Sequence, residues 1–236
     1  KDERSCALRF HAQTAGSTLT SQQPDNNVVR VAIQALAAVL GGAQSLHTNA
    51  KDEALALPTE AAALLALRTQ QIVAHESHVT QTSDPLGGSW YLEELTGKLE
   101  REAEAYMKNI RSMGGVLAAI DSGYIQKEIQ EAAYVHQKRL EERQERVVGL
   151  NCFQEEDDSP IEVLRVDLAV ERKQKERLEA LREQRDSAKA QAALEKVGKA
   201  ARGRANLMPV IIAAVEAQAT VGEIANAMKD VFGEHR

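Results

Sequence analysis

Residues 41–60 read GGAQSLHTNAKDEALALPTE, and the fold predicted from the sequence depends on this stretch. Ala43–Thr48 has the length and composition of a short buried strand, and it runs into a polar loop. We expect Pro58 to open the next helix. Proline lacks a backbone N–H, and this costs nothing in the first turn, where N–H groups have no hydrogen-bond partner within the helix. Ligands of α/β folds bind at the carboxyl ends of strands, so this loop is a candidate site.

A second strand is predicted before this stretch. Ala7–Gln13 alternates apolar and polar residues with a period of two, which is typical of a strand with one polar face. Val28–Leu40 is apolar on nearly all sides and predicts a buried helix that ends at Gly41. Strand, helix and strand in this order predict one parallel βαβ unit. Two parallel strands leave unpaired edges, so we expect the other strands to come from a partner chain or an N-terminal part.

The rest of the chain is predicted to be mainly helical. The apolar spacing predicts a helix over Pro58–His78 that buries its leucines together with Ile72 and Val73. A charged, solvated helix is expected over Ala169–Val197, and a capping box at Thr220 opens the last helix. The other predicted elements are helices over Trp90–Met113, Val116–Ser122, Gln126–Glu145 and Asn206–Ala219, and short strands over Arg146–Asn151 and Ile161–Asp167.

Composition narrows the function classes. The chain has 236 residues, of which 43% are hydrophobic and only 3% aromatic, and it carries a formal net charge of −6. An acidic chain is a poor partner for nucleic acid, which binds basic surfaces. No apolar run approaches the ~20 residues that a membrane span needs, and no signal peptide is evident. Cys6 and Cys152 lack metal-ligand spacing, so we expect no metal site and a reducing, cytoplasmic setting.

Polar side chains gather where the two predicted strands end. Arg9, His11 and Gln13 share a face of the first strand, and Gln44, Asn49 and Glu53 follow or flank the second. Such groups can hydrogen-bond a ribose, an amide or a phosphate ester. Alternatively, these side chains hydrogen-bond to backbone groups of the loops. Without further information, the residue types favour this structural role over a ligand site. Neither strand carries a glycine-rich nucleotide-binding motif.

Two segments carry a family resemblance. At RFHAQTAG (residues 9–16) and GGAQSLHTN (residues 41–49) the chain resembles the adenosylcobalamin-dependent acyl-CoA mutases. The similarity continues through DEAL (52–55), LPT (57–59), DPLGGS (84–89) and FGEH (232–235), and it covers essentially the whole chain. These runs are long and specific to the family.

The resemblance implies a fold and a division into domains. The class is α/β: residues 1–80 would be the final strands and helices of a (β/α)8 TIM barrel that binds the substrate. Residues 81–236 would be a largely helical segment that wraps the barrel and leads to a cobalamin-binding domain. The first six barrel strands and that domain, with its cobalt-ligand motif, would lie outside this sequence.

The resemblance also implies roles for six residues. His11 and Gln13, helped by Arg9, would line the barrel beside the CoA arm, and Gln44 would contact the pantetheine or thioester region. Asn49 and Glu53 would hold the ribose of the adenosyl group. The loop over residues 14–20 would form part of the cavity that faces the corrin. No catalytic residue is assigned within this chain.

The implied activity is a radical rearrangement of a carbon skeleton, with adenosylcobalamin as cofactor. The expected reaction interconverts methylmalonyl-CoA and succinyl-CoA, and isobutyryl-CoA or 2-hydroxyisobutyryl-CoA are alternative substrates. The expected partners are the N-terminal barrel portion and a cobalamin-binding domain or small subunit, in an oligomer. A non-catalytic assembly or interaction remnant is the second kind of function that stays open.

Overall fold

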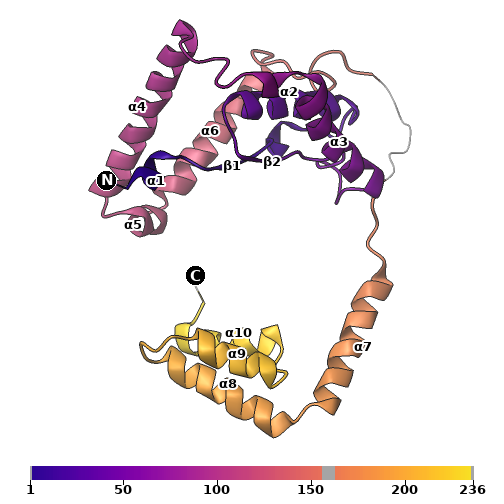
Figure 1. The fold of residues 1–236 in the computed structure, drawn as a ribbon, viewed down its shortest axis with the longest axis vertical. Coiled ribbons are helices and arrows are strands. Elements are labelled where there is room, and N and C mark those ends of the chain that lie inside the picture. Colours follow the sequence, from indigo (N-terminus) through magenta and orange to yellow (C-terminus); the bar gives the residue numbers. More distant parts are fainter. Residues whose placement is uncertain (1, 156–162, 235–236) are drawn as a thin grey trace. The chain divides into compact units, whose positions relative to one another are not determined.

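The computed structural model describes residues 2–155 and 163–234, which form two compact units, one on either side of Leu164. The first unit contains both strands, and the second is helical (Figure 1). In the first unit the elements are α1 (Glu3–Cys6), β1 (His11–Gln13), η1 (Gly16–Thr18), α2 (Asn26–Leu40), β2 (Ser45–His47), α3 (Glu60–Glu76), η2 (Val79–Gln81), α4 (Trp90–Ser112), α5 (Val116–Asp121) and α6 (Tyr124–Glu141). The second contains α7 (Leu168–Gln184), α8 (Ser187–Ala201), α9 (Met208–Glu216) and α10 (Val221–Phe232).

The predicted βαβ unit is confirmed. β1 and β2 pair in parallel, with His11 opposite Ser45 and Gln13 opposite His47, and α2 connects them. Both strands are shorter than predicted. Beyond the ladder, the carbonyl of Phe10 still accepts from the backbone N–H of Gln44 at 3.3 Å, but its own N–H donates to the Gln44 side chain instead. In the described residues each strand has a single neighbour, so nothing extends the ladder further.

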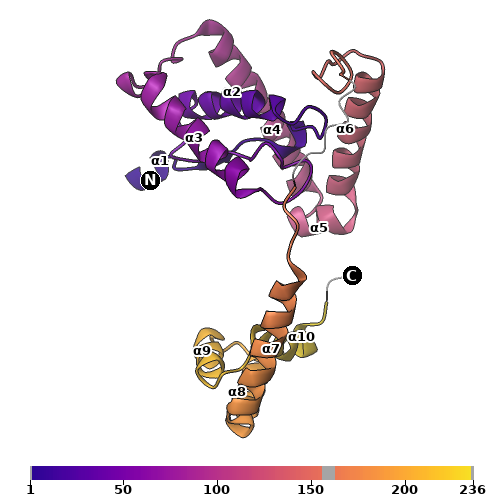
Figure 2. The same cartoon turned by 90° about the vertical axis from the view of Figure 1, so that its right-hand side faces the viewer.

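Helices α2 and α3 pack against one another beside the short sheet (Figures 1 and 2). Helix α3 begins at Glu60 and not at Pro58, because the Thr59 side chain accepts from the N–H of Ala62 and caps it. The predicted buried face of α3 is largely wrong: its buried residues are Ala62, Ala66, Thr69 and Val73, whereas Leu64 and Leu67 are nearly half exposed. Small side chains let α3 approach its neighbours closely, and the larger leucines lie on the side that no described element covers.

Two predicted strands are absent from the described chain. Over Arg146–Asn151 the structure has only an isolated bridge between Val148 and Cys152. Of the segment Ile161–Asp167, residues 161–162 lie outside the description and residues 163–167 form no strand. Pairing of a strand depends on a partner elsewhere in the chain, and these short apolar runs have none here.

The second unit is a small helical body, and its core is built mostly from alanines. Helix α8 packs against α9 and α10, and the residues buried between them are Ala193, Val197, Ala214, Ala217, Ala219 and Ile224. The single charged helix predicted over Ala169–Val197 is divided into α7 and α8. Arg185 adopts an extended conformation at the division, and the Asp186 side chain then caps α8 by accepting from the N–H of Lys189. The capping box at Thr220 is confirmed.

None of the helices in the described residues combines the length and the hydropathy that crossing a membrane requires.

Candidate functional site

The candidate site lies where β1 and β2 end. The parallel pairing brings both carboxyl ends to one edge, and the N–H of Thr14 continues the ladder by donating to the carbonyl of His47 at 3.0 Å. Thr14, Thr48 and Asn49 are all buried at this edge. The first residues of both loops are therefore fixed to one another, which makes this edge a rigid platform for side chains that follow.

The side chain of Asn49 is the centre of this platform. Its Oδ1 accepts from Thr14 Oγ1 at 3.1 Å and from Gln13 Nε2 at 3.2 Å. In return, Thr14 Oγ1 accepts from the backbone N–H of Asn49 at 2.9 Å. Asn49 is only 2% exposed, and its Nδ2 has no hydrogen-bond partner in the part of the chain that the structure describes. A buried amide donor without a partner is uncommon and indicates a group that is missing from its surroundings.

Glu53 lies beside this unsatisfied donor. A Cβ atom built on Gly16 would lie 2.9 Å from Asn49 Nδ2 and 3.3 Å from Glu53 Oε1, so both groups face the same glycine of the loop after β1. Glu53 is exposed, so its carboxylate is open to a ligand. An amide donor and a carboxylate acceptor next to each other suit a pair of hydroxyl groups, each of which can accept and donate.

The loop that carries Asn49 and Glu53 is held at several points. Thr48 Oγ1 donates to the carbonyl of Ala66 in α3 at 2.7 Å, and Asp52 Oδ2 accepts from the N–H of Thr59 at 2.9 Å. On the other side, Asn27 of α2 donates through Nδ2 to the carbonyl of Lys51 and to that of Thr20, each at 2.8 Å. Asn27 is fully buried and thus ties the loop after β1 to the loop after β2.

The structure brings together three of the six predicted site residues, namely Gln13, Asn49 and Glu53. The other three lie toward the amino ends of the strands. His11 Nδ1 is 2.8 Å from Ser45 Oγ, and Arg9 is exposed ahead of β1. Gln44 bonds to backbone groups: its Oε1 accepts from the N–H of Phe10 at 2.8 Å and its Nε2 donates to the carbonyl of Gly42 at 2.6 Å. In this structure Gln44 therefore hydrogen-bonds to backbone groups of the loops, which is the structural role considered as the alternative to ligand binding.

Sequence reasoning gave no separate role to Thr14 or Gly16. Both lie in the small-residue loop that was expected to face a cofactor, but their contacts with Asn49 cross 35 and 33 positions of the sequence. No local pattern reveals which side chain an individual threonine reaches. The small residues at positions 14–16 were the available signal, because close approach of two loops requires them.

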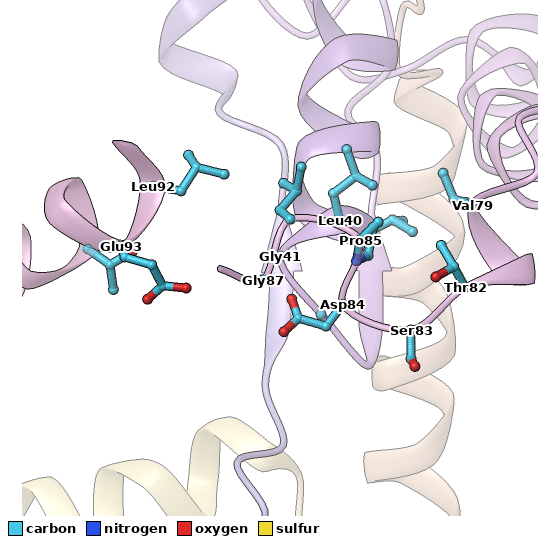
Figure 3. Close-up of a pocket in the computed structure, with 14 residues that line it drawn as sticks. Leu40, Gly41, Val79, Thr82, Ser83, Asp84, Pro85, Gly87, Leu92 and Glu93 are labelled. Carbon is cyan, nitrogen blue, oxygen red and sulfur yellow. The ribbon is translucent and has the colours of Figure 1, made fainter. Parts of the chain in front are cut away.

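A hollow lies elsewhere in the first unit (Figure 3). It has a volume of 670 Å³ and is lined by the end of α2, the turn around Asp84 and Pro85, and the start of α4. Glu93 faces it and accepts from the N–H of Gly88 at 3.0 Å. Because Gly41 and Gly42 precede β2, this hollow lies at the amino end of that strand, and none of the six predicted site residues lines it.

Comparison with known proteins gives one consistent family. The sequence profile of the family described as methylmalonyl-CoA mutase matches residues 1–234. Over 98% of its length the chain is 43% identical to a methylmalonyl-CoA mutase of Rhizobium meliloti, and over its whole length it is 42% identical to the mitochondrial methylmalonyl-CoA mutase of Mus musculus. It is 45% identical to a 2-hydroxyisobutanoyl-CoA mutase large subunit of Aquincola tertiaricarbonis. The chain spans 33%, 32% and 42% of these three proteins.

Proposed function

The chain belongs to the methylmalonyl-CoA mutase family, and on this premise we propose that it forms part of the active-site wall of an adenosylcobalamin-dependent mutase. The proposed reaction is the interconversion of methylmalonyl-CoA and succinyl-CoA. The observation that carries the proposal is the convergence of Asn49 Nδ2 and Glu53 Oε1 on Gly16. These two groups would bind the ribose hydroxyls of the adenosyl group.

Three features of this chain suit the adenosyl group. The buried Nδ2 of Asn49 lacks an acceptor within the described residues, and a ribose hydroxyl oxygen would provide one. Gly16 leaves open the space that a side chain would take between the two polar groups. The carboxylate of Glu53 can accept from a ribose hydroxyl, and hydrogen bonds to an ionised acceptor are the stronger kind.

The proposed contribution of these residues is orientation. When bound, adenosylcobalamin supplies a cobalt–carbon bond that cleaves homolytically, which is chemistry no side chain offers. Asn49 and Glu53 would fix the ribose and so set where the adjacent reactive carbon lies relative to the substrate. Positioning of this kind can contribute several kcal/mol to a rate. The fixed loop around them, tied to α2 and α3, is what such positioning requires.

Arg9, His11, Gln13 and Gln44 are the proposed contacts to the CoA ester. Gln13 is next to Asn49 and would lie between the ester and the ribose. Gln44 would have to exchange its bonds to Phe10 and Gly42 for a bond to the thioester or pantetheine. His11 and Arg9 are exposed and free to approach the phosphate-bearing arm.

The apolar surface of this chain supports a larger assembly. Leu8 is 75% exposed, and Val29 and Ile33 of α2 are 60% and 65% exposed. Such surface is usually covered in a working protein. We propose that the N-terminal barrel portion covers it, and that a cobalamin-binding domain or small subunit completes the site.

The test is an assay of the complete mutase that contains this chain. With adenosylcobalamin and methylmalonyl-CoA as substrate, we expect succinyl-CoA to form. Chromatography of the CoA esters measures its formation. Conversion of 2-hydroxyisobutanoyl-CoA instead would favour the second candidate function, a 2-hydroxyisobutanoyl-CoA mutase. The chain is as similar to the Aquincola protein of that name as to the methylmalonyl-CoA mutases. If the assembly turns over neither ester and does not bind adenosylcobalamin, the non-catalytic alternative is correct.

A further inference from the structure

The orientation of the Asn49 amide determines what it can offer a ligand. One orientation presents the NH₂ group toward Gly16 and Glu53, and the other presents the carbonyl oxygen there. Only the first supplies a hydrogen-bond donor, and the second would place an oxygen dipole next to the Glu53 carboxylate. The two orientations have the same shape, so neighbouring hydrogen-bond partners must select between them.

Thr14 is the neighbour best placed to make this selection. Its Oγ1 accepts from the backbone N–H of Asn49 at 2.9 Å, which leaves the hydroxyl proton free to donate. The hydroxyl donates to Asn49 Oδ1, with 3.1 Å between the two oxygens. Gln13 donates to the same oxygen at 3.2 Å, but its side chain is exposed, whereas Thr14 is 5% exposed. Because Thr14 is buried between the two loops, water cannot readily replace Asn49 as the hydrogen-bond partner of its hydroxyl.

We propose that Thr14 is a positioning residue that fixes the Asn49 amide with its NH₂ group toward the ribose of the adenosyl group. The inference rests on the proposed function and adds a residue that does not itself touch the ligand. Thr14 holds both the backbone and the side chain of Asn49, and donation from its hydroxyl to Oδ1 favours the orientation in which the NH₂ group faces Gly16 before any ligand binds. Preorganisation of this kind lowers the cost of ordering the site on binding.

The experiment compares two forms of the cofactor on the complete mutase. Adenosylcobalamin carries the ribose in question and hydroxocobalamin does not, so their affinities separate this contact from binding of the corrin. We expect Thr14→Val to weaken binding of adenosylcobalamin about tenfold, the loss of roughly one hydrogen bond, and to change hydroxocobalamin binding less than twofold. Thr14→Ser retains the hydroxyl and should restore the affinity for adenosylcobalamin.

A matched control is Thr69→Val. Thr69 is also a buried threonine, but its hydroxyl donates to the carbonyl of Leu65 within α3. We expect a loss of thermal stability in both valine variants, with the preference for adenosylcobalamin retained only in Thr69→Val. In an Asn49→Ala background Thr14→Val should have no further effect on adenosylcobalamin affinity, because Thr14 acts through Asn49. If Thr14→Val folds poorly, Thr14→Ala, which also removes the hydroxyl, takes its place in each of these comparisons.

The outcomes are separable. If the unmodified mutase prefers adenosylcobalamin and Thr14→Val retains that preference, the role of Thr14 is wrong and the proposed function stands. Equal weakening of both cofactor forms would likewise overturn the role, because it indicates a general structural defect. If the unmodified mutase binds both forms equally, the ribose site itself is wrong, and the inference fails with it.

Discussion

Gly16 and Asn49 approach so closely that a methyl group on Gly16 would lie 2.9 Å from Asn49 Nδ2. The amide cannot easily move away, because its Oδ1 is already bonded to Thr14 and Gln13. The same methyl group would also be 3.3 Å from Glu53 Oε1. An alanine here would therefore occupy the space between the donor and the acceptor of the candidate site.

We expect Gly16→Ala to weaken binding of adenosylcobalamin at least about tenfold, because the Cβ would take the space that we propose for the ribose. Binding of hydroxocobalamin should remain within about twofold, which absorbance titrations of the complete mutase can measure. Gly222→Ala is the control, since a Cβ at Gly222 meets no atom within 4 Å. Unchanged adenosylcobalamin affinity in Gly16→Ala would argue against a ligand at this position.

Glu53→Ala is expected to lower turnover more than it lowers affinity for the CoA ester. The carboxylate would hold the ribose and not the substrate, so kcat should fall about tenfold or more while KM for methylmalonyl-CoA changes less than about twofold. Steady-state assays of the complete mutase measure both. Glu60→Ala, an exposed carboxylate in the first turn of α3, should leave both constants unchanged. Equal losses in kcat and in CoA-ester affinity would contradict the role of Glu53.

The parts of this fold that depend on local sequence were predictable. The period of two in the first strand, the glycines after α2 and the capping box at Thr220 all act over a few residues, and the structure has each of these elements, although the first strand covers only His11–Gln13. Asn49 and Glu53 could be singled out because they follow a strand in an α/β pattern. Their convergence on Gly16 could not be predicted from the neighbouring sequence, because it depends on how the loop after β1 and the loop after β2 pack together.

The parts that failed depend on distant partners. The division between α7 and α8 occurs at Arg185, whose guanidinium bonds to Glu223, 38 positions away. The leucines of α3 are spaced as on one face of a helix. The face that is buried instead carries small residues such as Ala62 and Ala66, which allow close approach of the neighbouring elements. Apolar periodicity indicates that a face is available for burial, and only the neighbouring elements decide which face is used.

Asn27→Ala should destabilise the first unit, by about 3 kcal/mol. Its side chain is fully buried, donates to the carbonyls of Thr20 and Lys51, and accepts from the N–H of Thr20 at 3.1 Å. Removal of the amide leaves these backbone groups buried without partners, at a cost of roughly 1–3 kcal/mol each. Hydrogen exchange of the backbone amides of α2 and α3 at increasing urea concentration reports on this unit.

The matched control is the neighbouring Asn26→Ala. Asn26 is partly buried, and its side chain donates to Gln23 Oε1. We expect a loss below about 1 kcal/mol, because a partly exposed bond can be replaced by one to water. If both variants unfold at the same urea concentration, Asn27 does not tie the two loops together as its contacts indicate.

Glu223→Gln should remove most of the acid sensitivity of the helical second unit. The Arg185 guanidinium donates to both carboxylate oxygens of Glu223, at 2.7 and 2.6 Å, and lowers the pKa of that carboxyl from 4.5 to about 2. Backbone and hydroxyl donors of Thr220 act in the same direction. A carboxyl whose pKa is lowered by folding stabilises the fold above its unfolded pKa, and this contribution is lost as the pH falls from about 4.5 toward 2.

At pH 6 we expect Glu223→Gln to be less stable than the unmodified chain by about 3 kcal/mol, the value that corresponds to a pKa shift of this size. The difference should shrink steadily below pH 4.5 and approach zero near pH 2, where the carboxyl of the unmodified chain also becomes neutral. Urea unfolding followed by circular dichroism at several pH values gives both curves. Lys229→Met, which removes only the exposed cation paired with Glu234, should leave the pH dependence unchanged. A difference that stays constant from pH 6 to pH 3 would show that the Arg185–Glu223 pair does not stabilise this unit through its charge.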